Sequence, residues 1–96
     1  MHGEYKVPGG KLVVVDLTVV DGLLTDVRVS GDFFLEPDSA LDVINHALSG
    51  QPAVAGGGAW AEAIDRALGD GVSLYGITSA GVGIAVERAV RDGAAP

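Results

Sequence analysis

Residues 12–30 carry the pattern that most restricts how this chain can fold. Residues 12–20 read LVVVDLTVV, and residues 23–30 read LLTDVRVS. Runs rich in β-branched residues are typical of strands rather than helices. Asp21 and Gly22 separate the two runs and are common turn residues. The segment therefore predicts a β-hairpin.

The loop length of this hairpin decides which side chains are buried, because a shift of one residue reverses the faces of a strand. A two-residue loop at Asp21-Gly22 would place apolar Leu17 opposite Asp26. A three-residue loop at residues 20–22 instead brings apolar side chains together. Its facing pairs are Val19 with Leu23, Val15 with Val27, and Val13 with Val29. We therefore expect the longer loop, although it also sets Asp16 opposite Asp26, an unfavourable like-charge pair.

The rest of the chain predicts one more short strand and three helices. The strand is expected at residues 33–35, between a turn at residues 30–32 and Pro37. Apolar spacing and capping residues predict the first helix from Asp38 or Ser39 to just before Gly50. A Gly-rich linker at residues 50–58 leads to a second helix at residues 59–68. The third helix should begin at Thr78 or Ser79 and end near residues 91–93.

Strands that precede helices favour the α+β class. We expect a two-layer fold in which the helices pack on one face of a three-stranded antiparallel sheet. A chain of 96 residues fits a single domain, residues 1–96, with a β-rich part at 1–37 and a helical part at 38–96.

Charge and composition exclude several classes of function. Thirteen acidic residues outnumber six scattered Lys and Arg residues, for a net charge of −7, whereas nucleic-acid binding needs clustered bases. Cysteine is absent, which excludes disulfides and thiolate metal sites and fits a cytoplasmic protein. The first residues resemble no signal peptide, and the apolar runs are too short for a membrane span. We expect no nucleic-acid or membrane partner.

Few residues are candidates for chemistry. The segment KVPGGK at residues 6–11 sets two lysines around a Pro-Gly-Gly turn whose amides can meet an anion. It lacks the spacing of a P-loop, so a turn with solvated lysines is the simpler interpretation. His2 fits a frayed terminus and His46 a packed or surface position on a helix, while Ser39 and Ser79 fit helix caps. We therefore expect no catalytic residue and no metal site, which favours an accessory or binding role.

Two segments resemble a known family. YKVPGGKLV at residues 5–13 and SGDFFLEP at residues 30–37 are similar to the C-terminal accessory domain of lipoate–protein ligases. The likeness is greatest to the split form, in which that domain is a separate small subunit. It is good over residues 4–50 and weak over residues 51–96, where the glycine-rich linker and Gly81 and Gly83 depart from the family.

The resemblance implies a function. The family's ligases use Mg-ATP to activate lipoate to lipoyl-adenylate, and then transfer the lipoyl group to a lysine of an acceptor domain in 2-oxoacid dehydrogenase or glycine cleavage complexes. Catalytic residues belong to the large subunit, so this chain is implied to be a non-catalytic partner that binds no cofactor alone. The implied fold is similar to that of SufE/NifU-type iron–sulfur scaffolds. Residues implied to lie near the partner or the adenylate are Lys6, Gly9, Gly10, Lys11, Asp32 and Phe33.

Two other classes remain as alternatives. An iron–sulfur or sulfur-transfer scaffold shares the implied fold, but its chemistry needs cysteine. A freestanding small-ligand or regulatory binding module, unrelated to ligation, is the other hypothesis.

Overall fold

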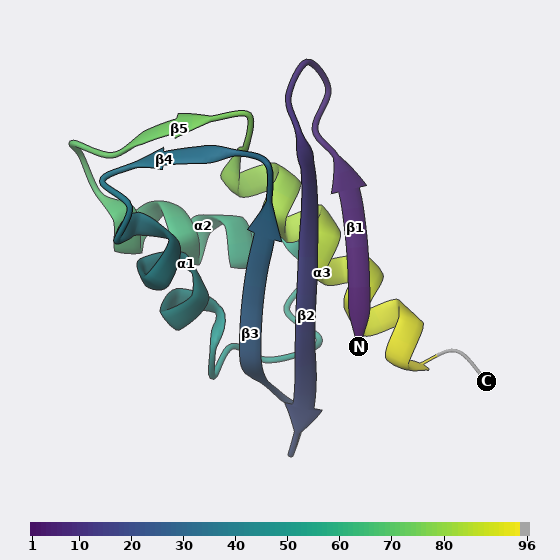
Figure 1. The fold of residues 1–96 in the computed structure, drawn as a ribbon. Helices are drawn as coiled ribbons and strands as arrows, with labels where there is room; N and C mark the ends of the chain where they lie inside the picture. The colour runs from purple at the N-terminus through teal and green to yellow at the C-terminus, as the bar shows by residue number, and fades with distance from the viewer. Residues whose placement is uncertain (95–96) are drawn as a thin grey trace.

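The predicted hairpin forms the centre and one edge of a three-stranded antiparallel sheet (Figure 1). The computed structural model describes residues 1–94. The sheet has the order β1-β2-β3, with β1 at His2–Lys6, β2 at Leu12–Val20 and β3 at Leu23–Gly31. The helices are α1 at Ala40–Leu48, α2 at Gly57–Leu68 and α3 at Ser79–Ala94. Helix α3 packs on β1 and β2, α1 packs on β3, and α2 contacts the other two helices. The expected two-layer α+β class is confirmed.

The prediction of a three-residue hairpin loop is wrong. The pairs Val20–Leu23 and Val19–Leu24 leave only Asp21 and Gly22 in the loop. Both have positive φ, 53° and 77°, as a type I′ turn requires.

A β-bulge in β3 allows the short loop while the apolar side chains of the strand are still buried. Asp26 and Val27 both face Leu17, with Asp26 at φ 50°, so the strand reverses its faces there. Leu24 is buried before the bulge and Val27 and Val29 after it, whereas Leu23 is exposed, contrary to the predicted face. The expected Asp16–Asp26 pair does not form, because Asp16 lies opposite Arg28.

Two strands were not predicted. Residues 2–6 form β1 rather than a frayed terminus, and Gly3 within this strand and Val7 just after it are buried. The short strand near residues 33–35 does form, as β4 at Phe34–Glu36. It pairs with β5 at Ser73–Tyr75 in a separate two-stranded ribbon instead of joining the main sheet.

The helices lie close to their predicted positions. Helix α1 begins after Ser39, although the Ser39 side chain makes no capping hydrogen bond. Helix α2 begins two residues earlier than expected, inside the glycine run. At the start of α3, the Thr78 hydroxyl accepts a hydrogen bond from the Gly81 amide at 2.9 Å, which confirms Thr78 as the cap. Among the helices of residues 1–94, none is both long and apolar enough to cross a membrane.

The core lies between the sheet and the helices. Val13, Val15 and Leu17 of β2 point into it, as predicted, and Trp60 of α2 is 2% exposed. The apolar side chains between the layers account for most of the favourable free energy of folding. Within the described residues, the structure buries no charged or polar side chain.

Candidate functional site

The Lys6–Lys11 segment is a tight turn at one end of the sheet, joining β1 to β2 (Figure 1). The Gly10 amide donates to the Val7 carbonyl at 2.8 Å. Pro8 and Gly9 occupy the two central positions, and Gly9 has φ 72°. Proline followed by a residue of positive φ defines a type II turn. The Pro-Gly-Gly sequence is therefore explained by local geometry.

This turn is anchored to the segment that precedes α3. The Lys11 amide donates to the Gly76 carbonyl at 2.8 Å. A Cβ at Gly10 would lie 2.8 Å from that same carbonyl oxygen, and a Cβ at Gly76 would lie 2.7 Å from Cγ of Lys11. Neither position has room for a side chain. The stem of Lys11 thus packs on the backbone of Gly76, which fixes the direction in which that lysine leaves the turn.

Lys6 is held by the turn itself. Its Nζ donates to the Gly10 carbonyl at 2.7 Å and contacts the Val7 carbonyl oxygen at 3.4 Å. The ammonium group is still exposed on its other side. Since carbonyls neutralise no charge, Lys6 places a fixed cation at the mouth of the turn.

Helix α3 adds to the positive charge at this end. Its first residues follow Thr78, which with Ile77 and Gly76 lines one side of a shallow hollow of about 200 Å³. Residues 7–10 of the turn line the other side. The N-terminus of an α-helix carries a partial positive charge. Two lysines and this helix terminus therefore give a positive region to a chain whose net charge is −7.

Asp32 and Phe33 lie at the same end of the sheet, in the link from β3 to β4. The Phe33 ring covers Gly31, where a Cβ would be 3.0 Å from ring carbons and would overlap the Leu12 carbonyl. Phe33 is half-buried and Asp32 is exposed. The structure thus places the six predicted residues at one end, although within residues 1–94 no ion pair joins Asp32 to either lysine.

An exposed aromatic pair next to Phe33 was missed by the sequence analysis. The rings of Phe34 in β4 and Tyr75 in β5 lie 5.5 Å apart at 37°. Tyr75 is 41 positions further along the chain than Phe34, so no local sequence pattern links the two residues. Exposure alternates in residues 73–75, where Leu74 is less exposed than its two neighbours, but three residues are too short a sequence pattern to predict a strand.

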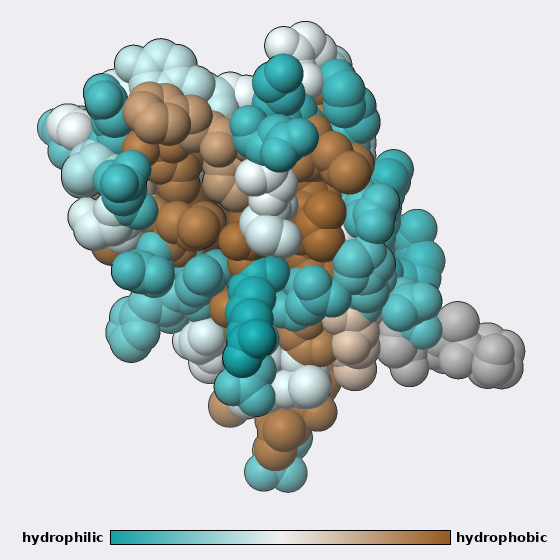
Figure 2. All heavy atoms as spheres, in the orientation of Figure 1, coloured by the Kyte–Doolittle hydropathy of each residue, from teal (hydrophilic) through white to brown (hydrophobic). Residues whose placement is uncertain are grey.

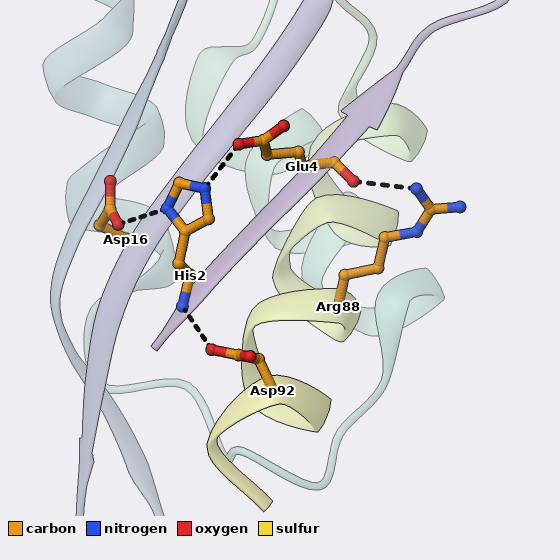
Figure 3. Close-up of polar contacts among 5 residues, drawn as sticks. All are labelled: His2, Glu4, Asp16, Arg88 and Asp92. Atoms are coloured by element: carbon orange, nitrogen blue, oxygen red, sulfur yellow. Dashed lines mark hydrogen bonds and ion pairs between the residues drawn. The ribbon is translucent and has the colours of Figure 1, made fainter. Parts of the chain in front are cut away.

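A second polar cluster lies at the opposite end of β1 (Figure 3). His2 Nδ1 is 2.7 Å from Asp16 Oδ1, and Nε2 is 2.7 Å from Glu4 Oε2. Hydrogen bonds to Glu4 and then to Asp16 raise the pKa of His2 above 6.5. Arg88 of α3 donates to the Glu4 carbonyl at 2.9 Å, and Asp92 accepts from the His2 amide at 3.4 Å. These contacts tie the outer edge of β1 to α3.

The two clusters offer different groups to a ligand. The His2 ring has a carboxylate on each nitrogen, so both ring nitrogens are already paired within the fold. In the part of the chain that the structure describes, no three His, Asp or Glu side chains group as metal ligands do. The positive end offers cations and backbone amides, which can hold or orient an anionic group.

No protein-family model matches the chain, and no curated protein matches it either. Among solved structures, it is similar to a chain from an archaeal lipoylation system, described as a bi-partite lipoate protein ligase and its E2 lipoyl domain from Thermoplasma acidophilum. The TM-score is 0.73 at 21% identity, over 90% of this chain and 92% of that chain. This likeness establishes a shared fold. The matched chain comes from a bipartite lipoate protein ligase system, and the sequence resemblance also pointed to ligases of this kind.

Proposed function

We propose that this chain is the accessory subunit of a bipartite lipoate–protein ligase. It acts with a separate catalytic subunit in the ATP-dependent activation of lipoate to lipoyl-adenylate. The observation that carries the proposal is the fold match, which covers 90% of this chain and 92% of a chain from a bipartite ligase system. Because the two shares are nearly equal, the two chains have similar lengths. The matched chain is therefore also small, which supports the assignment of this chain as the small subunit.

The proposal assigns the reaction to the complex and not to this chain alone. Lipoate and Mg-ATP bind to the catalytic subunit, and the acceptor lysine is on a lipoyl domain that this chain meets only indirectly. The complex works in the cytoplasm. Three hollows in residues 1–94 have volumes of about 180–240 Å³, below the roughly 300–1,000 Å³ of typical ligand pockets. None of these three favours the alternative of a freestanding small-ligand module.

We assign the positive end of the sheet to the activation step. Adenylation concentrates negative charge on the triphosphate and on the departing pyrophosphate. Lys6 Nζ is held by the Gly10 carbonyl, and the stem of Lys11 packs on Gly76, so the Lys6 charge and the start of the Lys11 side chain are positioned before any ligand arrives. Preorganised cations of this kind stabilise developing negative charge without reorganisation. Asp32 and Phe33 lie at the same end of the sheet, and we assign them to the contact with the catalytic subunit.

Complex formation tests the proposal. Mixing this chain with the catalytic subunit encoded in the same genome should give one earlier-eluting species and a higher melting temperature for this chain. A partner that binds only the folded form at about 100 times its Kd stabilises that form by about 2.7 kcal/mol. Separate elution and unchanged melting at micromolar concentrations would contradict the proposal.

Neutralising the two lysines tests the role of the positive end. Lys6→Gln plus Lys11→Gln keeps the side-chain stems and a donor for the Gly10 carbonyl, but removes both charges. We expect adenylation by the complex to slow at least tenfold, about 1.4 kcal/mol in the barrier, while transfer from preformed lipoyl-adenylate continues. Arg66→Gln plus Arg91→Gln removes the same charge from exposed positions on α2 and α3 and serves as the matched control. Equal rates for the two double variants would refute this role.

A further inference from the structure

The ribbon of β4 and β5 presents apolar side chains to solvent. Leu35 is buried, while Phe34 before it points outward on the same strand. Phe34 and Tyr75 are each 51% exposed, and their rings contact one another across the ribbon. Exposed large aromatic side chains are unfavourable in water. An exposed pair of touching aromatic rings therefore suits a surface that another molecule covers.

A hollow of about 240 Å³ lies beside this pair. Phe33, Phe34, Leu35 and Leu41 line it, together with the single carboxylate of Asp38. Figure 2 shows brown, apolar atoms gathered at the upper left, where Figure 1 places β4 and β5, with teal atoms around them. The hollow is thus apolar on its walls and carries one negative charge.

The chain segment that lines the hollow is acidic. Residues 29–65 contain six acidic residues and no Lys or Arg. Four of the six, all exposed, come from the segment that forms β4 and the start of α1: Asp32, Glu36, Asp38 and Asp42. A second copy of this chain would set acidic surface against acidic surface, which is repulsive. Charge complementarity instead favours a partner that is basic at this point.

We propose that the hollow beside Phe34 and Tyr75 docks an arginine- or lysine-bearing apolar segment of the catalytic subunit. This inference rests on the proposed function and names the contact. The cation lies near Asp38, its aliphatic stem packs on the aromatic pair, and its charge interacts with the ring faces. Aromatic residues and arginine are the most common anchors of protein interfaces. The acidic hollow thus binds the partner, while the lysine turn serves the anionic substrate.

Binding of the catalytic subunit, measured by calorimetry, tests this assignment. Phe34→Ala removes the aromatic contact, and Asp38→Lys reverses the charge; each should weaken binding at least tenfold. Val54→Ala truncates an apolar side chain that is 94% exposed elsewhere, and Asp65→Lys makes the same change in net charge on α2. Both controls should stay within about twofold, as distant surface changes do. Wild-type affinity should also fall between about 50 and about 300 mM salt, and less so for Asp38→Lys.

Two outcomes would overturn the inference. If the wild type binds and both Phe34→Ala and Asp38→Lys bind equally well, the docking site is wrong while the proposed function stands. If the wild type does not bind the catalytic subunit, the proposed function and this contact both fail. Asp38 is exposed, so its variant decides the question even if Phe34→Ala does not fold.

Discussion

Replacing Gly83 by alanine tests how α2 and α3 are packed. Gly83 is buried in α3, and a Cβ there would lie 2.5 Å from the carbonyl oxygen of Gly57 and 3.3 Å from its Cα. Both contacts are to backbone, so no side chain can move aside. The two helices would have to separate by about 0.5–1 Å, which forfeits a quarter to a half of each dispersion contact between them.

The expected magnitude is a difference between two effects. Overpacking of a buried contact costs about 1–3 kcal/mol, and a backbone obstacle places this case in the upper part of that range. Alanine regains about 1 kcal/mol of helix propensity. We therefore expect Gly83→Ala to lower the free energy of unfolding by about 1–2 kcal/mol, which for a chain of this size lowers the melting temperature by roughly 4–16 °C.

Urea denaturation followed by fluorescence is the assay, because Trp60 is the single tryptophan and is 2% exposed. Gly58→Ala in α2 is the matched control, since a Cβ there meets nothing within 4 Å. It should be neutral or stabilise by up to about 1 kcal/mol. A Gly83→Ala variant as stable as Gly58→Ala would refute the close contact between the helices.

Two further predictions concern the sheet. Asp26→Ala should destabilise the fold by about 1 kcal/mol in urea titrations, because φ is 50° at the bulge and alanine tolerates that region less well than aspartate. Asp26→Gly should not destabilise the fold, and equal losses of stability in the two variants would contradict the explanation. The raised pKa of His2 means that the charged ring stabilises the fold below about pH 6.5, and that this contribution is lost as pH rises through the folded-state pKa. His2→Gln should flatten this pH dependence, and an NMR titration that finds a His2 pKa at or below 6.5 would contradict it.

The hairpin shows what the sequence could and could not predict. The β-branched runs identified both strands, but the choice of loop assumed a regular ladder. A bulge at Asp26 allows a two-residue turn and a buried face together, and aspartate at that position gives no distinctive signal. Strand β1 was missed because its buried Gly3 lies against the backbone of Ala85 and Ala89. Such a contact depends on a helix more than 80 positions away.

The same limit applies to the candidate site. KVPGGK and GDFF were identified from the sequence, and the structure places them at one end of the sheet. The helix terminus at Thr78 and the aromatic partner Tyr75 come from the C-terminal half, where the resemblance is weak. In the sequence, Gly83 stood out as a departure from the family, whereas the structure shows it as the point where α3 meets Gly57.

Formation of lipoyl-adenylate is the most direct test of the central claim. The catalytic subunit is incubated with lipoate and Mg-ATP in the presence and absence of this chain, and this chain is also incubated alone. We expect adenylate only when both proteins are present, because the proposed function assigns the chemistry to the large subunit and the stabilising lysines to this chain. Full activity of the catalytic subunit alone, or adenylate formed by this chain alone, would contradict the account.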